Sequence, residues 1–334
     1  MLKNKRFLSI LCALIMCFGM MIPSAFADDA ATGDLAYAPS GMVSDGNGGL
    51  YMVDCENNVL LHMDSNGATT VAAGTVSDDD DPIVGIMDYD PENPGKAQSL
   101  ADVMMDAPFG IARYSKGYLI TDEGNARLRY FDGKQFVTFK YSGTYTFKRP
   151  TGITTGPSGS VFVADAGKHC IVKIDAKGKA TVYAGKSGTK GCADGSKTSV
   201  ARFKNPYGIY YKNSKLYVAD AGNNRVVEIN ASTKKAKTIA GSKKGTAGDV
   251  NGSATTTARL NGPHNVYVSG TTVYIADFGN GDVKKLKSGK VSTFISAYSK
   301  KNGMAPAGPT GLIVKDGKLW VGDTFAKTII KKSI

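Results

Sequence analysis

The stretch that decides the fold runs from residue 206 to residue 241 and reads PYGIYYKNSKLYVADAGNNRVVEINASTKKAKTIAG. It contains four short runs rich in aliphatic, aromatic and β-branched residues, at 209–211, 216–220, 225–229 and 236–240. Turns rich in Gly, Asn, Lys and Ser separate these runs. The pattern predicts four short antiparallel strands joined by tight turns. No segment after residue 28 shows a convincing helical period.

The same unit recurs six times along the chain. Each copy opens with a proline and reaches an aspartate 14 or 15 residues later, at Pro39 and Asp54, Pro108 and Asp122, Pro150 and Asp165, Pro206 and Asp220, Pro263 and Asp277, and Pro309 and Asp323. The distance from one proline to the next varies (69, 42, 56, 57 and 46 residues), so the insertions fall in the connections. Six four-stranded units predict an all-β, six-bladed β-propeller. Its blade cores start near residues 39, 108, 150, 206, 263 and 309.

The last unit ends after its third strand, at 328–334. We expect the segment around Asp34-Leu35-Ala36-Tyr37 to supply the missing fourth strand and so to close the ring. The alternative is an open solenoid of six units, which would leave unpaired blades at both ends.

The first 27 residues have the pattern of a secretory signal peptide. Lys3, Lys5 and Arg6 precede an apolar run at 7–22, and Ala25-Phe26-Ala27 is an A-x-A cleavage site. We expect cleavage after residue 27, which leaves a propeller at 28–334 without a membrane span. The expected location is extracellular, either free or associated with the cell wall. A retained signal anchor is the alternative, but an apolar run of sixteen residues is short for a span.

Charge is segregated along the chain. Residues 28–110 carry sixteen acidic residues and one basic residue, whereas residues 111–334 carry thirty-seven basic and thirteen acidic residues. Such a division predicts either two opposed charged faces or a basic arc that binds a polyanion. The expected basic residues lie in the connections between blades: Lys186, Lys190, Arg202, Lys204, Lys243, Lys244, Arg259, Lys300 and Lys301. For an exported protein the expected partner is an anionic cell-envelope polysaccharide, not nucleic acid.

The pattern P-x-G, then Y-V-A-D-x-G-N-N-R, then A-G resembles the NHL repeat. The segment 218–226, VADAGNNRV, carries the resemblance most clearly, and the connection 249–263 resembles an inter-blade linker of this family. The resemblance covers essentially all of 28–334 and implies the propeller fold. It says little about function, because the family includes binding platforms as well as enzymes.

The middle residues of the P-x-G turns are the candidate ligand-binding residues. In a four-stranded blade these turns open onto the same face as the turn between strands two and three, around the mouth of the central channel. The residues at this position are Ser40, Phe109, Thr151, Tyr207, His264 and Thr310. Polar and aromatic side chains around a concave mouth suit a sugar, a peptide or a small molecule. The alternative is that these side chains only plug the channel.

The aspartates that end the second strands have a structural interpretation. A carboxylate before a Gly/Asn turn accepts backbone N–H bonds and holds the turn, which explains all six copies at once. The three histidines, His62, His169 and His264, could in principle bind zinc. The resemblance implies that zinc histidines directly follow the blade proline in the related amidating lyases, and here only His264 does so.

The acidic connection 77–106 is the candidate metal site. Its carboxylates suit calcium, and the candidate ligands are Asp78, Asp79, Asp80, Asp81, Asp88 and Asp90. The loop lacks a complete calcium-binding spacing, so a solvated acidic loop without a cofactor is the favoured interpretation.

Three cysteines remain after residue 27. Cys170 and Cys192 both belong to the third blade and its following connection, so we expect a disulfide between them, with Cys55 left over. The alternative is that Cys55, Cys170 and Cys192 all remain free thiols.

These observations predict a monomeric, exported binding module without catalytic residues. Its expected ligand is a polysaccharide, a peptide or protein, or an anionic cell-envelope polymer at the channel mouth. The competing hypothesis is a propeller enzyme of the lyase or lactonase kind with a metal in the central channel. A passive structural surface protein is the third hypothesis.

Overall fold

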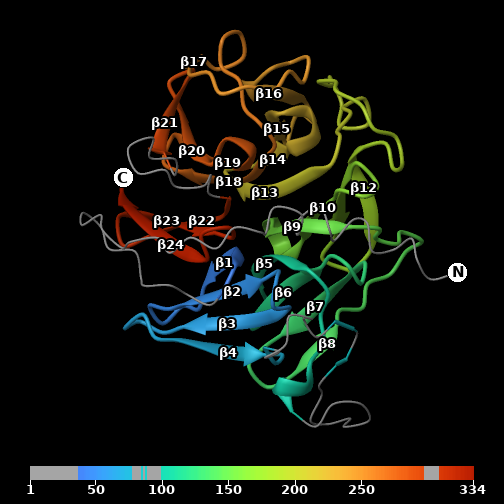
Figure 1. Ribbon diagram of the computed structural model, residues 1–334. Helices are drawn as coiled ribbons and strands as arrows, with labels where there is room; N and C mark the ends of the chain where they lie inside the picture. The colour runs from blue at the N-terminus through green and yellow to red at the C-terminus, as the bar shows by residue number, and fades with distance from the viewer. Residues whose placement is uncertain (1–36, 77–83, 86, 89–98, 297–307) are drawn as a thin grey trace, which may run out of the picture.

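The computed structural model describes residues 37–76, 84–85, 87–88, 99–296 and 308–334. These residues form six antiparallel sheets that are arranged as blades around a central axis (Figure 1). The predicted all-β six-bladed propeller is confirmed. None of the helices in the described ranges is long and apolar enough to cross a membrane.

Each blade is a meander whose strands follow one another in sequence order. Blade one comprises β1 (Pro39–Ser44), β2 (Leu50–Asp54), β3 (Val59–Met63) and β4 (Thr69–Ala73). Blade two comprises β5 (Pro108–Tyr114), β6 (Gly117–Asp122), β7 (Arg127–Phe131) and β8 (Phe136–Thr138). Blade three comprises β9 (Pro150–Thr155), β10 (Val161–Asp165), β11 (Cys170–Ile174) and β12 (Ala180–Gly185).

Blade four comprises β13 (Pro206–Lys212), β14 (Lys215–Asp220), β15 (Arg225–Asn230) and β16 (Ala236–Gly241). Blade five comprises β18 (Pro263–Ser269), β19 (Thr272–Asp277), β20 (Asp282–Lys287) and β21 (Lys290–Ser296), with the short β17 (Gly252–Ser253) on its outer edge. Blade six comprises β22 (Pro309–Lys315), β23 (Lys318–Asp323) and β24 (Thr328–Ser333). Four single-turn 3-10 helices lie in the connections: η1 (Leu100–Asp102), η2 (Pro157–Gly159), η3 (Ala221–Asn223) and η4 (Phe278–Asn280).

The sixth blade lies next to the first, so the ring of blades is complete. The hydroxyl of Thr310 on β22 donates to the carbonyl of Pro39 on β1 at 3.1 Å. Within the described residues blade six has three strands. Of the predicted closing segment, residues 34–36 lie outside the described residues, so the origin of a fourth strand remains a prediction.

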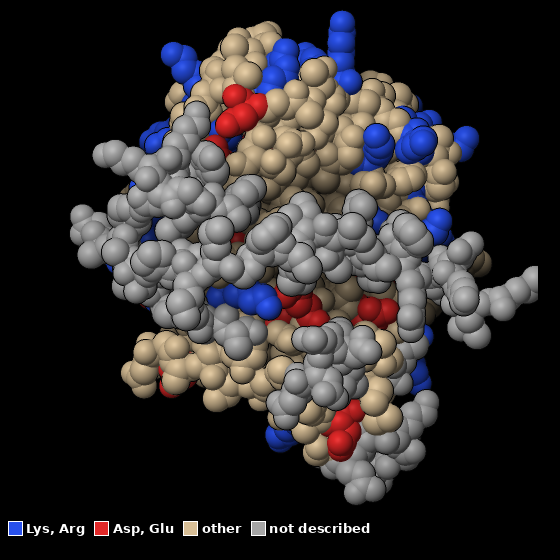
Figure 2. Space-filling view, viewed as in Figure 1, with Lys and Arg blue, Asp and Glu red and all other residues tan. Residues whose placement is uncertain are grey.

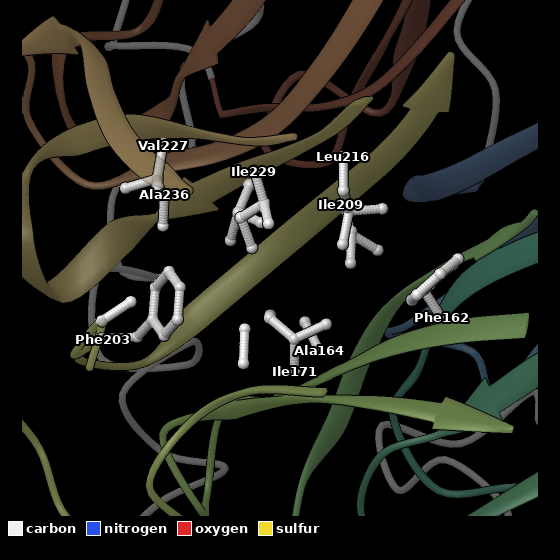
Figure 3. Close-up of a cluster of buried hydrophobic side chains, with 12 residues drawn as sticks. Phe162, Ala164, Ile171, Phe203, Ile209, Leu216, Val227, Ile229 and Ala236 are labelled. Carbon is white, nitrogen blue, oxygen red and sulfur yellow. The ribbon is translucent and has the colours of Figure 1, made fainter. Parts of the chain in front are cut away.

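The hydrophobic core is divided among the six seams between neighbouring blades. Each of six buried clusters draws its side chains from two adjacent blades. The seam between blades three and four is typical, with Phe162, Ala164 and Ile171 facing Ile209 and Leu216 (Figure 3). Because both faces of every blade are covered, the strands are apolar on both sides and need no helical layer.

The glycine of the P-x-G turn is required by the approach of the next blade. A Cβ on Gly110 would lie 2.5 Å from the carbonyl oxygen of Thr151, and one on Gly152 would lie 2.5 Å from that of Tyr207. These separations are shorter than any real Cβ contact, so a side chain there would push the blades apart. Blade five has Asn265 at this position, and its amide nitrogen donates to the Thr310 carbonyl at 2.8 Å.

The six aspartates that end the second strands are all fully buried, and we call them the latch aspartates. Each carboxylate accepts a backbone N–H from the chain segment that enters the same blade. The donors are Ala38 to Asp54, Asp106 to Asp122, Arg149 to Asp165, Lys204 to Asp220, Asn261 to Asp277 and Gly308 to Asp323, at 2.7–3.1 Å. The predicted hold on the following turn is also confirmed: Asp54, Asp165 and Asp323 accept backbone N–H groups of that turn, and in the other three blades an Asn side chain of the turn donates to the carboxylate.

Buried cations accompany the latch in three blades. The guanidinium of Arg225 contacts Asp220 at 2.8 Å and Asp194 of the preceding connection at 3.1 Å. Arg129 in blade two joins Asp122 at 3.0 Å to Asp88 at 2.8 Å in the same way. In blade five, Lys284 contacts the connection residue Asp249 and also Asp282. Each cation therefore ties a connection to the interior of its blade.

The predicted disulfide between Cys170 and Cys192 is wrong: the described residues contain no disulfide. Cys170 is buried in the seam between blades two and three, where its sulfur lies 3.3 Å from the Tyr145 hydroxyl. Cys192 faces the other way, and its thiol donates to the Lys243 carbonyl in the connection between blades four and five, at 3.4 Å. Sharing a blade did not bring the two sulfurs together, because they point towards different neighbours.

The latch aspartates should differ in how much they contribute to stability, because some of them pair with a buried cation and others do not. We expect Asp220→Asn to lower the free energy of unfolding by about 3 kcal/mol, because it removes the fully buried charge partner of Arg225. Asp323 accepts backbone N–H bonds from Gly308 and Ala326. No cation pairs with it among the described residues, so Asp323→Asn should cost only about 1 kcal/mol. Denaturant unfolding of both variants measures the difference, and equal losses would contradict a special role for the ion pair.

Candidate functional site

The face that carries the P-x-G turns is the candidate functional face, and we call it the mouth face. The first strand of every blade starts there, the second strand ends there at its latch aspartate, and the turn between strands two and three follows. The positions directly after the blade proline and directly after the latch aspartate therefore both lie on this face. The loops between strands one and two, and between strands three and four, lie on the opposite face.

Three of the six predicted mouth residues meet as rings over the axis. The rings of Phe109 and Tyr207 lie 5.2 Å apart edge to face, and those of Tyr207 and His264 are parallel at 4.5 Å. The ring centroids of Phe109 and His264 are 6.3 Å apart, also edge to face. Phe109 belongs to blade two and His264 to blade five, which are opposite each other in a ring of six. Their rings therefore lie across the central axis at this level, which favours the plug that the sequence left as the alternative to a ligand-binding mouth.

Two further aromatic residues extend this group towards solvent. Phe278 stacks on His264 with ring centroids 3.8 Å apart, and Phe325 lies 5.1 Å from Phe278. Phe325 is 47% exposed, whereas Phe109 is only 7% exposed. The five residues, which we call the aromatic cluster, therefore run from a buried plug to an open surface. An exposed aromatic ring that continues a buried ring stack offers apolar contact area to a ligand.

His264 is neutral at physiological pH. Burial, with a smaller contribution from the positive charge of Arg149, lowers the pKa of His264 to about 3. Its Nδ1 atom is buried and has no hydrogen-bond partner among the described residues. The imidazole thus acts as an aromatic ring between Tyr207 and Phe278.

An ion pair borders the aromatic cluster. Arg149 precedes the blade-three proline, and its Nε lies 3.2 Å from a carboxylate oxygen of Glu123 in the turn after Asp122. The same guanidinium lies 5.5 Å from the centre of the Tyr207 ring. Burial raises the pKa of Glu123 to about 7, although Arg149 opposes this shift. The mouth therefore holds a carboxyl group that changes its protonation near neutral pH.

The remaining predicted mouth residues lie in the seams. Ser40, Thr151 and Thr310 are at most 3% exposed. Their hydroxyls donate across the seam to carbonyls of the next blade, for example from Ser40 to Pro108 at 3.2 Å and from Thr151 to Pro206 at 3.1 Å. These three side chains hold neighbouring blades together and do not contribute to the open surface.

The predicted polyanion-binding residues divide into two groups. Lys186, Lys190, Lys204, Lys243 and Lys244 are exposed. Arg202 and Arg259 are half-buried, and each guanidinium donates to three consecutive backbone carbonyls just before it, at 2.8–3.1 Å. Lys and Arg side chains gather over the upper part of the molecule, around blades three to five (Figure 2). Lys300 and Lys301 lie outside the described residues.

Of the six predicted calcium ligands, only Asp88 belongs to the described residues. Its carboxylate pairs with Arg129 at 2.8 Å and accepts a hydrogen bond from the Thr138 hydroxyl at 3.0 Å. A buried guanidinium therefore occupies the position that a cation would take. Asp78, Asp79, Asp80, Asp81 and Asp90 lie outside the described residues.

The histidines lie in three separate environments. His62 pairs with Asp45 at 2.9 Å on the opposite face, and the Nδ1 of His169 accepts the backbone N–H of Asn205. His264 lies in the aromatic cluster. Across the described ranges, no group of three or more His, Cys, Asp or Glu residues is arranged to hold a metal ion.

Sequence reasoning missed Phe278, Phe325, Glu123 and Arg149. A signal for three of them was present, because Glu123 and Phe278 directly follow a latch aspartate and Phe325 comes one residue later. The residues after the latch vary between blades just as the P-x-G residues do, and both sets reach the mouth face. Considering both sets together would have identified most of the cluster.

Comparison with known proteins supports the resemblance to NHL repeats. Residues 147–174, in blade three, match the sequence model of the NHL repeat. The chain is 25% identical over 303 residues to NHL repeat-containing protein 2 of Gallus gallus, which covers 79% of this chain. The match spans only 41% of the length of that relative.

Solved propellers share the fold at low identity. A virginiamycin B lyase from Staphylococcus aureus, a catalytically inactive histidine-to-alanine variant bound to quinupristin, is similar with a TM-score of 0.57 and 14% identity. That match covers 92% of this chain and 98% of the lyase. An auxiliary nutrient binding protein from Bacteroides thetaiotaomicron gives a TM-score of 0.63 at 13% identity, over 88% of this chain and 69% of that protein. At these identities the likeness shows the fold alone.

The low pKa of His264 gives a pH dependence that can be tested. An unfolded histidine has a pKa of about 6.5, so between pH 6.5 and 4 the unfolded chain binds a proton that the folded chain does not. Stability from this residue is therefore lost as the pH falls. Between pH 7 and pH 5 the wild type should lose about 2 kcal/mol of its free energy of unfolding through this residue. His264→Phe should not show this loss, because phenylalanine does not titrate.

Urea unfolding of the wild type and His264→Phe at pH 7, 6 and 5 measures this difference. Phenylalanine keeps the ring stack with Tyr207 and Phe278, so both proteins should fold. Parallel stability curves over this range would show that His264 titrates normally in the folded state.

Proposed function

We propose that this chain is an exported binding module whose mouth face holds an extended ligand, and that an anionic cell-envelope polysaccharide suits this face best. The observation that carries the proposal is the aromatic cluster, which ends at the 47% exposed ring of Phe325. Flat aromatic surfaces give a sugar ring or a peptide apolar contact at low entropic cost. The exposed lysines of the connections would bind the negative charges of the same ligand.

Three further features support this proposal: the blocked central axis, a guanidinium beside it and the signal-peptide pattern. The rings of Phe109, Tyr207 and His264 lie across the central axis and block it. A ligand would therefore lie on the mouth face and would not enter the channel. The Arg149 guanidinium borders these rings and offers a charged donor near Tyr207. The signal-peptide pattern at 1–27 supports export, and the protein would then act outside the cell as a monomer.

Retention on an immobilised anionic polysaccharide, heparin–agarose, tests the proposal with the chain 28–334. Phe325→Ala should reduce retention while leaving the melting temperature nearly unchanged, because the ring is half exposed. Phe294→Ala is the matched control, since Phe294 packs on Tyr274 away from the mouth face. Equal retention of both variants and the wild type would refute a role for the aromatic cluster.

The basic connections should add a salt-dependent contribution to the same binding. Changing Lys186, Lys190, Lys243 and Lys244 together to Ser should shift elution to lower salt. Binding should also weaken steeply between 0.1 and 1 M NaCl, as the screening length falls from about 10 Å to about 3 Å. Retention that persists unchanged in molar salt would argue against an anionic ligand.

A second candidate function is catalysis of the lyase or lactonase kind. The Glu123–Arg149 pair favours it, because a carboxyl group with a pKa near 7 can act as a general acid or base at neutral pH. A pH-stat assay with a simple sugar lactone, with and without added Mg²⁺, Ca²⁺ or Zn²⁺, tests this function. Turnover that is lost in Glu123→Gln would establish an enzyme, and no turnover under any of these conditions would leave the binding module.

A further inference from the structure

A pocket lies on the face opposite the mouth, between blades six and one. It has a volume of about 210 Å³, which accommodates several water molecules or one small organic molecule. Blade one contributes the loops around Gly48 and Ser65, and blade six contributes Lys315, Trp320 and Lys331. These loops join strands one and two or strands three and four, so the pocket is separate from the aromatic cluster.

The indole of Trp320 forms part of the wall. Trp320 lies on β23, opposite Lys331 on β24, and its ring belongs to the buried cluster between blades six and one. The residue is 8% exposed, and its Nε1 atom has no hydrogen-bond partner among the described residues. An indole N–H can only donate, so this buried group lacks an acceptor.

Two ammonium groups lie over the same ring. The Nζ of Lys331 is 4.0 Å from the ring centre and that of Lys315 is 4.9 Å from it. Lys315 pairs with Asp316, whose side chain is 73% exposed, so solvent weakens this ion pair and a ligand can compete for the ammonium group. Lys331 pairs with no carboxylate in the described part of the chain. Burial lowers the pKa of Lys331, and the ammonium groups of Lys315 and Lys318 lower it further.

The pocket therefore combines an unpaired cation with an unused N–H donor. The remaining acid in the wall, Asp64, already accepts the backbone N–H groups of Asn66 and Ala68. A bound oxyanion would supply both the missing negative charge and the missing acceptor. An ammonium–oxyanion contact in a partly buried site is among the stronger hydrogen bonds.

We propose that this pocket binds the carboxylate or phosphate group of a small ligand, with Lys331, Lys315 and the Trp320 indole N–H as its donors. The site is independent of the proposed function at the mouth face, because it shares no residue with it. The carboxylate of an acidic sugar and a phosphate group offer the same chemistry here. The two sources are separated by the test.

The test uses the fact that Trp320 is the single tryptophan of the chain. The intact protein is titrated with inorganic phosphate, with glucuronate and with glucose, at constant low ionic strength, while the Trp emission is followed. Phosphate, glucuronate or both should give a saturable change, and glucose, which lacks the anionic group, should give none. Whichever anion binds more tightly identifies the source.

Lys331→Gln should weaken anion binding about tenfold or more. Lys332→Gln is the matched control, because Lys332 is the next residue of the same strand and lies over Phe294, away from Trp320. Isothermal titration calorimetry with the same anions keeps the test independent of changes in Trp emission. Phe325→Ala, at the mouth face, should leave the anion affinity unchanged.

The result that would overturn the proposal is equally definite. If neither emission nor heat responds to the anions, or if Lys331→Gln and Lys332→Gln bind them alike, the Lys–Trp contact is only a structural cross-strand pair. Should Lys331→Gln fail to fold, Lys315→Gln is measured against the same control and decides the outcome in the same way.

Discussion

The contact between each latch aspartate and the backbone entering its blade is the interaction on which the rest of the structure depends. The blades themselves are local meanders, but the connections between them differ in length and sequence. A buried carboxylate at the end of the second strand receives the last N–H groups of the incoming chain, at 2.7–3.1 Å. Whatever path a connection takes, it therefore arrives at the same place.

The placement of the mouth follows from that constraint. Because the chain is held just before the blade proline, the next residue always lies at the inner end of its blade, beside the central axis. The glycine after it lets the neighbouring blade approach so closely that a Cβ would overlap its carbonyl oxygen. The same six positions thus provide both the seams between blades and the lining of the axis. Small hydroxyl residues serve the seams, whereas Phe109, Tyr207 and His264 fill the centre.

Buried charge is used differently in the two halves of this architecture. On the mouth side, Arg129, Arg225 and Lys284 meet carboxylates from both the latch region and the connection, so their desolvation is compensated. On the opposite face, Lys331 lies over Trp320 without such a carboxylate among the described residues. One set of cations stabilises the fold, and the other leaves a charge that a ligand can satisfy.

The repeat in the sequence determined the architecture, because the proline, the glycine and the aspartate each answer a local backbone requirement. A turn that must approach its neighbour needs glycine, and a strand end that must hold N–H groups needs a short carboxylate. Such requirements are visible without any knowledge of distant contacts. The convergence of Phe109, Tyr207 and His264 also followed from the repeat, since equivalent positions in a ring meet at its axis.

Only the tertiary structure decided which side chains face each other across a seam. Cys170 and Cys192 share a blade yet point to different neighbours, and Asp88 faces Arg129 although forty-one residues separate them. The meeting of Trp320 with blade-one loops likewise depends on ring closure, which joins the two ends of the chain. The physical reason is that strand pairing is periodic and local, whereas the direction and depth of each side chain depend on the packing of a neighbouring blade.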